Sequence, residues 1–151
     1  MKNNNNRSGK QAVRPKTTRD IFSKRKRSEI MSAIKSKNTV LEKRLFLLLR
    51  KRGIKFRTHY NGVIGKPDIA LPKSRKAVFL HSDFWHGWRL STWEHILPSK
   101  FWKMKLNKNR VRDKKVLRTL RRKGWKVMIL WGHSFRKDQE SSVARIARFL
   151  K

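Results

Sequence analysis

The chain has 151 residues, and its 42 Lys and Arg against 9 Asp and Glu give a formal net charge of +33. A charge this one-sided resists compaction unless a polyanion neutralises it, so we expect DNA or RNA as the partner, with an anionic membrane surface as the weaker alternative. No apolar run reaches the roughly 20 residues of a membrane span, and the absence of cysteine excludes disulfides and thiolate metal sites.

The first part of the chain combines a basic tail with two helical patterns. Residues 1–20 are polar and without periodicity, and they predict either a disordered arm that lies along phosphates or an inert tail. Residues 21–151 are expected to form one domain. No apolar segment follows the basic start, as a signal peptide would require, and we expect a cytoplasmic protein, associated with the nucleoid if it is bacterial.

Residues 23–37 predict a short helix with Met31 on its apolar edge. A second helix is predicted to begin at Thr39, because Thr39 and Glu42 match a capping box in which a hydroxyl and a carboxylate satisfy orphan backbone donors. Gly53 is expected to end this helix. Its predicted buried stripe consists of Leu41, Leu45, Leu48 and Leu49.

Three short strands are predicted next, at residues 54–60, 67–71 and 76–83. Because side chains alternate along a strand, Asp68 should face away from Ile69, and His81 should face away from Leu80. Residues 84–98 are expected to form a loop rich in Trp and His.

A long helix over residues 99–123 should follow, stopped by Gly124, with Asp113 on its core-facing side, where an unpaired charge is costly. The continuous apolar run 125–131 predicts a strand in the centre of the sheet. Residues 141–150 predict a closing amphipathic helix. This order of elements indicates an α/β fold with a mixed sheet.

Four of the nine acids fall in or beside predicted core elements: Glu42, Asp68, Asp83 and Asp113. Carboxylates in such positions repel phosphate unless a cation intervenes, and Mg²⁺ takes oxygen ligands and bridges carboxylate to phosphate. Asp68, which follows Pro67 at a strand start, is the best candidate ligand, with a turn or strand-end cap as the alternative. The alternative for Glu42 is the capping box itself, and for Asp113 an ion pair with a neighbouring Arg or Lys.

His86 and His81 are the candidates for proton transfer, because imidazole accepts and donates protons near neutral pH. A carboxylate such as Asp113 would fix the tautomer of His86. A lone histidine is usually structural, but the titratable groups gathered around His86 favour a functional role.

The chain resembles the very-short-patch-repair (Vsr-type) DNA mismatch endonuclease family in five blocks that follow the family order over residues 23–131. These blocks are SEIMSAIKSKNTVLEKRL, GKPDIALP, AVFLHSDFWHGW, FWKMKLNKNRVRD and GWKVMILW. The resemblance implies a restriction-endonuclease-like fold, a mixed β-sheet flanked by helices. It also implies a Mg²⁺-dependent monomer that nicks one strand of double-stranded DNA, 5′ of the T in a T:G mismatch.

Carried over by motif, the resemblance makes Asp68 the main Mg²⁺ ligand and the Leu80 backbone carbonyl the second. It makes His86, paired with Asp113, the acid and base, supported by Glu42, and it places His81 in the same active-site region. The residues expected to contact DNA are an aromatic wedge of Phe84, Trp85 and Trp102, the intercalating Met31, and the basic Lys66 and Arg110.

The chain also departs from the family. The best-known members bind a structural zinc through cysteines and histidine around the FWH loop, whereas here Asp83, Trp88 and His133 stand at such positions. We therefore expect that zinc site to be absent and Asp83 to be structural. Leu80 replaces a threonine, which a backbone carbonyl ligand tolerates.

Two other functions stay as alternatives. A homing-type or sequence-specific endonuclease would share the chemistry but cut a fully paired site. A non-catalytic, ribosomal or chromatin-like protein would bind nucleic acid through its charge alone, and its acids would be dispensable.

Overall fold

The computed structural model describes residues 23, 25–26, 28–29, 37–97 and 99–151. The expected N-terminal arm, residues 1–20, and Met31 lie outside these residues. The helix expected over residues 23–37 is described only in part, and its residues 25–26 and 28–29 are helical.

The centre of the molecule is a four-stranded sheet in the order β1-β2-β3-β4. The strands are β1 (Arg57–Thr58), β2 (Ile69–Leu71), β3 (Lys76–His81) and β4 (Lys126–Trp131). The β1–β2 and β2–β3 pairs are antiparallel, and β3 and β4 run parallel. The predicted mixed sheet is therefore confirmed.

Two expectations about the strands were wrong. β4 is an edge strand of the described sheet and does not lie at its centre. Its continuous apolar run reflects helices packed on both faces, and that pattern says nothing about neighbours within the sheet. The strand expected over residues 54–60 shortens to β1, because His59 adopts a φ of +46° and turns the backbone out of the extended conformation.

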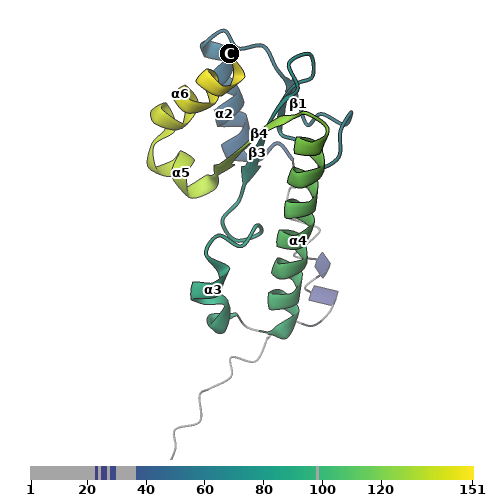
Figure 1. Cartoon of the computed structure of the whole chain (residues 1–151). Coiled ribbons are helices and arrows are strands. Elements are labelled where there is room, and N and C mark those ends of the chain that lie inside the picture. Colours follow the sequence, from purple (N-terminus) through teal and green to yellow (C-terminus); the bar gives the residue numbers. More distant parts are fainter. Residues whose placement is uncertain (1–22, 24, 27, 30–36, 98) are drawn as a thin grey trace, which may run out of the picture.

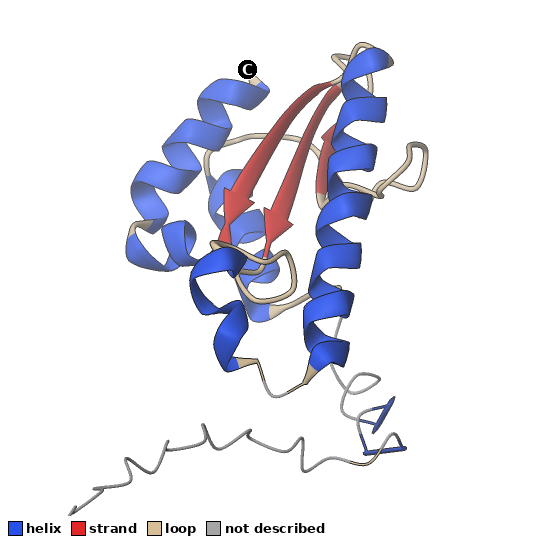
Figure 2. Cartoon of the chain, turned by 60° about the horizontal axis from the view of Figure 1, so that its bottom comes forward, coloured by secondary structure: helices blue, strands red, loops and turns tan. Residues whose placement is uncertain are grey.

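Helices cover both faces of the sheet (Figures 1 and 2). On one face lie α2 (Val40–Lys51), α5 (Gly132–Lys137) and α6 (Gln139–Leu150), and on the other lies α4 (Lys100–Arg122). The larger core cluster contains Leu45, Phe46, Leu49, Ile69, Val78, Leu130, Phe135, Val143, Ile146 and Leu150. The smaller one, beneath α4, contains Ala77, Phe79 and Leu120.

The strand alternation follows the prediction. Ile69 and Val78 face the larger cluster, whereas Phe79 faces α4. Asp68 is one residue before Ile69 and therefore points to the opposite face, the α4 face. His81 is two residues after Phe79 and therefore points to the same face as Phe79. His81 thus lies beside Asp113, near the middle of α4.

The predicted capping box of α2 is present: Thr39 Oγ1 accepts from the Glu42 N–H, and the Glu42 carboxylate accepts from the Thr39 N–H. Leu45 and Leu49 are fully buried as expected, and Phe46 joins them although the predicted stripe omitted it. Gly124 ends α4 with a φ of +76°, a conformation that glycine adopts at little cost.

The segment expected as a loop over residues 84–98 contains two short helical elements. They are α3 (Leu90–Trp93) and the 3₁₀ helix η1 (Glu94–Ile96). The sequence also gave no signal for α5, which places Phe135 in the core. Among the described residues, no helix has the length and apolarity needed to cross a membrane.

Candidate active site

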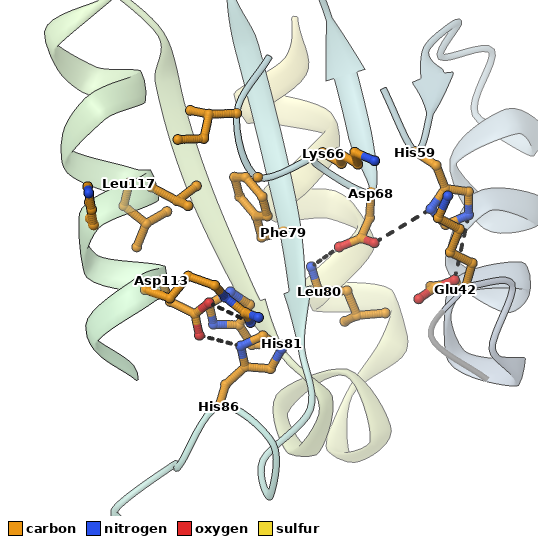
Figure 3. A pocket seen from close by; sticks show the side chains of 16 residues that line it. Glu42, His59, Lys66, Asp68, Phe79, Leu80, His81, His86, Asp113 and Leu117 are labelled. Atoms are coloured by element: carbon orange, nitrogen blue, oxygen red, sulfur yellow. Dashed lines mark hydrogen bonds and ion pairs between the residues drawn. The ribbon is translucent and has the colours of Figure 1, made fainter. Parts of the chain in front are cut away.

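A cavity of about 670 Å³ opens between α4, the ends of β2 and β3, and the N-terminus of α2 (Figure 3). It brings together side chains that lie far apart in the sequence. The candidate site residues that line it are Glu42, Lys66, Asp68, Leu80, His81, His86 and Asp113. Lys37, Arg112 and Lys115 add positive charge to the walls.

Asp68 is held at the end of β2 by the neighbouring strand. Its Oδ2 accepts a hydrogen bond of 2.7 Å from the Leu80 N–H. Burial raises the pKa of the Asp68 carboxyl to about 6; the hydrogen bond from Leu80 opposes the shift, and the negative charge of Glu42 adds to it. A carboxylate in this state is stabilised by any cation that enters the cavity.

The backbone of Leu80 lies beside the Asp68 carboxylate. The N–H and C=O of a strand residue point to the same side, so the Leu80 carbonyl is directed toward β2 as well. The register pairs Ile69 with Val78, and continuing it sets Pro67 opposite Leu80. Proline has no N–H to donate. The Leu80 carbonyl is therefore available beside Asp68.

His86 and Asp113 form the shortest polar contact of the cavity (Figure 3). Asp113 Oδ2 lies 2.6 Å from His86 Nδ1, and Arg112 contacts the other carboxylate oxygen at 3.2 Å. Burial by itself would raise the pKa of Asp113, but the hydrogen bond and charge of His86, with help from Arg112, hold it below its ordinary value. Asp113 is thus ionised and fixes the orientation of the His86 ring.

The ring of His81 packs against one face of the His86 ring. The two imidazole rings are stacked, with centroids 3.8 Å apart and planes 6° from parallel. Burial and the neighbouring His86 lower the pKa of His81 to about 4, so the ring is neutral at ordinary pH. The edge of Trp131 closes the other side of His81, at a centroid distance of 5.3 Å.

The loop that carries His86 is tied to the sheet by backbone bonds. The His86 N–H donates to the Ser82 carbonyl at 3.2 Å, and the Trp88 N–H donates to the Asp83 carbonyl at 2.8 Å. Gly87 has a φ of +63°, and a side chain there would collide with the stem of Arg110. Arg110 itself lines a second cavity of about 260 Å³ on the other side of the His86–Asp113 pair.

Glu42 has two roles in the structure. It closes the capping box of α2, and its carboxylate, on a residue only 5% exposed, also lines the cavity. The capping alternative and the site assignment are therefore compatible.

His59 is a cavity residue that the sequence reasoning missed. Its ring lies between two carboxylates, 3.7 Å from Glu42 and 3.8 Å from Asp68. It lies inside the alternating run of residues 54–60, which predicted a regular strand, and no signal marked it as a site residue.

Phe84, Trp85 and Trp102 come together as one aromatic cluster beside the cavity. Phe84 lies 4.9 Å from Trp85 and 6.0 Å from Trp102, measured between ring centroids. Trp93 of α3, which the sequence reasoning did not single out, stacks on Phe84 at 5.8 Å. Asn109 of α4 anchors the cluster by donating to the Trp85 carbonyl at 3.0 Å. Phe84 remains 40% exposed.

Asp83 lies outside the main cavity, in a separate polar contact. Its carboxylate accepts from the ring and backbone of His133, with Nδ1 at 2.6 Å, and it pairs with Arg136. Burial favours a higher pKa for Asp83, but the bonds from His133 and the charge of Arg136 hold it below its ordinary value. Trp88 packs on the His133 ring at 4.6 Å. These contacts join the His86 loop to α5.

Two groups of side chains among the described residues have the composition and spacing to hold a metal ion. One consists of Glu42, His59 and Asp68, and the other of His81, His86 and Asp113. The first is richer in carboxylate oxygen, the donor that hard cations prefer.

Comparison with known proteins gives one consistent family. Residues 19–92 match the family model for the DNA mismatch endonuclease Vsr. This segment includes Glu42, Asp68 and His86 and ends before Asp113. Together with the mixed sheet and its flanking helices, the match confirms the expected restriction-endonuclease-like fold.

Curated relatives extend the similarity. The type II nicking enzyme V.XorIIP of Xanthomonas oryzae pv. oryzae is 36% identical over 115 residues, which cover 74% of this chain and 83% of the relative. The DNA mismatch endonuclease Vsr of Escherichia coli (strain K12) is 34% identical over 113 residues, 74% of this chain and 72% of the relative. The type II nicking enzyme V.NmeAIP of Neisseria meningitidis is 39% identical over 114 residues, 74% of this chain and 81% of the relative. The chain therefore belongs to the Vsr family of DNA endonucleases.

Proposed function

We propose that the protein is a Mg²⁺-dependent endonuclease that acts as a monomer on double-stranded DNA and nicks one strand 5′ of the T in a T:G mismatch. One observation carries the proposal: the His86–Asp113 pair and the Asp68 carboxylate open onto the same basic-walled cavity. A proton-transfer group and a cation ligand are the two parts that hydrolysis of a phosphodiester needs.

The donor set of the cavity fits a hard divalent cation. Asp68 and the Leu80 carbonyl offer oxygen ligands, and the raised pKa of Asp68 is the expected behaviour of a buried carboxyl beside Glu42. Asp68 and Leu80 would hold the Mg²⁺ ion, with Glu42 behind them. When bound, Mg²⁺ supplies positive charge that stabilises the charge developing on the phosphate oxygens.

His86 is the group that moves the proton. Because Nδ1 is bonded to Asp113, Nε2 is the nitrogen presented to the substrate. The attacking water must lose a proton and the leaving oxygen must gain one, and Nε2 can take the first or give the second. Asp113 stabilises the imidazolium form, and the neutral His81 ring keeps His86 in place without competing for the proton.

The aromatic cluster of Phe84, Trp85 and Trp102 supports the mismatch part of the proposal. Inserting aromatic rings into a DNA stack costs a few kcal/mol, and a mismatched step opens at lower cost than a paired one. Phe84 is the most exposed member of the cluster, at 40%, and it is the ring that would enter the stack. Lys66 on the cavity wall and Arg110 behind it are available to bind phosphates.

The test is a nicking assay on a duplex with one T:G pair and a label on each strand, in MgCl₂ and in EDTA. The wild-type protein should nick the T strand only with Mg²⁺, and Asp68→Asn should leave it intact. Glu140→Gln, an exposed change on α6, serves as the matched control and should nick normally. If the wild type and Asp68→Asn leave the duplex equally intact, the proposal fails. Mg²⁺-dependent cutting of fully paired duplex alone would favour the sequence-specific alternative.

A further inference from the structure

His59 is placed between the two carboxylates of the main cavity (Figure 3). Its Nδ1 lies 3.8 Å from Asp68 Oδ1, and its Nε2 lies 3.7 Å from Glu42 Oε2. The side chain is only 15% exposed, so water does not fill the space on all sides. The ring therefore takes a direct part in the electrostatics of Asp68.

The neighbours of the ring determine which nitrogen carries hydrogen. Nε2 lies 3.2 Å from Asn38 Oδ1 and 3.7 Å from Glu42 Oε2. Both of these are oxygen acceptors, so the tautomer with its hydrogen on Nε2 satisfies them. In the neutral ring, Nδ1 then has a lone pair, and this lone pair faces Asp68 Oδ1.

In that tautomer, the lone pair and the carboxylate oxygen that face each other repel unless a proton or a metal cation lies between them. The two oxygens of Asp68 are used differently here: Oδ2 accepts from the Leu80 N–H, which leaves Oδ1 for another partner. Bonds of about 2.1 Å from one cation to a nitrogen and an oxygen span roughly 3 Å at a right angle and about 4.2 Å in line. The separation of 3.8 Å falls within that range.

The position of the ring is built into the fold. His59 has a φ of +46°, and its N–H donates to the Asp68 carbonyl at 3.1 Å. This backbone hydrogen bond fixes the position of His59 relative to Asp68. The edge of the ring packs against Phe46 of α2 at a centroid distance of 5.8 Å. A histidine whose other nitrogen is bonded to an oxygen acceptor is the usual arrangement of a metal-ligating imidazole.

We propose that His59 Nδ1 is a nitrogen ligand of the divalent cation held by Asp68, oriented by Asn38 and Glu42, and that it shifts the preference of the site from Mg²⁺ toward Mn²⁺. The proposal rests on the proposed function in one respect, that Asp68 holds a cation. The chemical reason is that Mg²⁺ takes oxygen ligands almost exclusively, whereas imidazole suits transition-metal ions. Mg²⁺ can still bind through the oxygen ligands, but His59 adds affinity only for transition-metal ions such as Mn²⁺.

The test uses the full chain with MnCl₂ or MgCl₂ and does not depend on nicking. Pulsed electron paramagnetic resonance on the Mn²⁺-loaded protein detects the coupling of a ligating imidazole nitrogen. This coupling should be present in the wild type and in the control His95→Gln, an exposed histidine of η1, and absent in His59→Gln. By calorimetry, His59→Gln should weaken Mn²⁺ binding by about tenfold or more and Mg²⁺ binding by less than about threefold. Asn38→Ala, which keeps the ring, should weaken Mn²⁺ binding by a smaller factor.

A nitrogen coupling that persists in His59→Gln would overturn the proposal, because the nitrogen would then come from another histidine such as His81 or His86. An equal loss of Mn²⁺ and Mg²⁺ affinity would overturn it too. The two proposals fail separately. If Asp68→Asn abolishes nicking while His59→Gln changes neither measurement, the nuclease assignment stands and the ligand assignment falls. If the nitrogen coupling behaves as expected but no duplex is nicked, the ligand assignment stands and the nuclease assignment falls.

Discussion

Asp113 Oδ2 on α4 lies 2.6 Å from Nδ1 of His86, which a loop 27 residues earlier in the chain presents to it. The contact pairs the charge on the core-facing side of α4, favours the tautomer of His86 with its hydrogen on Nδ1, and leaves Nε2 for the proposed proton transfer. Each consequence can be examined by changing one of the two partners.

Asp113→Asn should lower kcat for nicking by about 10²–10⁴ with little change in the KM for DNA. Asparagine keeps the shape of the side chain but loses the charge that stabilises protonated His86. Single-turnover and steady-state kinetics on one duplex measure both constants, with Glu140→Gln as the reference for an acid outside the cavity. An unchanged kcat would remove Asp113 from the mechanism.

Asp68→Asn should stabilise the metal-free fold while abolishing nicking. The pKa of Asp68 is about 6 in the fold against 3.8 in an unfolded chain, so the folded state binds a proton more tightly, and stability falls as pH rises through that window. Above pH 6 the full penalty persists, on the order of 3 kcal/mol. Denaturation in EDTA at pH 7.5 should show a Tm several degrees higher for the variant, and near pH 4 the difference should shrink. A variant less stable than the wild type at pH 7.5 would contradict the burial argument.

His81 should give the opposite dependence on pH. Its pKa falls from 6.5 to about 4 on folding, so the stability it contributes is fully present above pH 6.5 and is lost as pH falls toward 4. Because Asp68 titrates in the same window with the other sign, the comparison belongs in the Asp68→Asn background. There, His81→Gln should flatten the loss of stability between pH 6.5 and 4. Denaturant midpoints at half-unit pH steps measure this, and identical slopes with and without His81 would show that its ring titrates freely.

Phe84→Ala should reduce the preference for mismatched over paired DNA. Base–aromatic stacking is worth about 1–3 kcal/mol, so the ratio of kcat/KM for the two duplexes should fall by roughly tenfold. Ile96→Ala, another exposed apolar side chain of the same segment, is the matched control and should keep the wild-type ratio. If both variants keep the ratio, the aromatic cluster does not sense the mismatch.

The sequence predicted the parts of the site that depend on local patterns. Strand alternation turned Asp68 away from Ile69 and His81 away from Leu80, helical periodicity put Asp113 on the inner side of α4, and the capping box located Glu42. These three patterns depend on residues a few positions apart, so they can be recognised without knowing which distant segments come into contact.

The rest depends on contacts between distant segments. His59 enters the site through a single left-handed residue after a strand of two residues, and no periodicity marks such a turn. The Asp83–His133 contact joins positions 50 residues apart. The edge position of β4 also escaped prediction, because hydropathy reports how the faces of a strand are covered and not which strands stand beside it.

The most direct measurement is single-turnover nicking of two duplexes that differ at one base pair, T:G in one and T:A in the other, with excess protein in MgCl₂. We predict a cut on the T strand of the T:G duplex at least about tenfold faster than any cut on the T:A duplex, and no cut of either by Asp68→Asn, because a mismatched step opens at lower cost. Equal rates on the two duplexes would contradict mismatch recognition, and equal rates for wild type and Asp68→Asn would contradict the site itself.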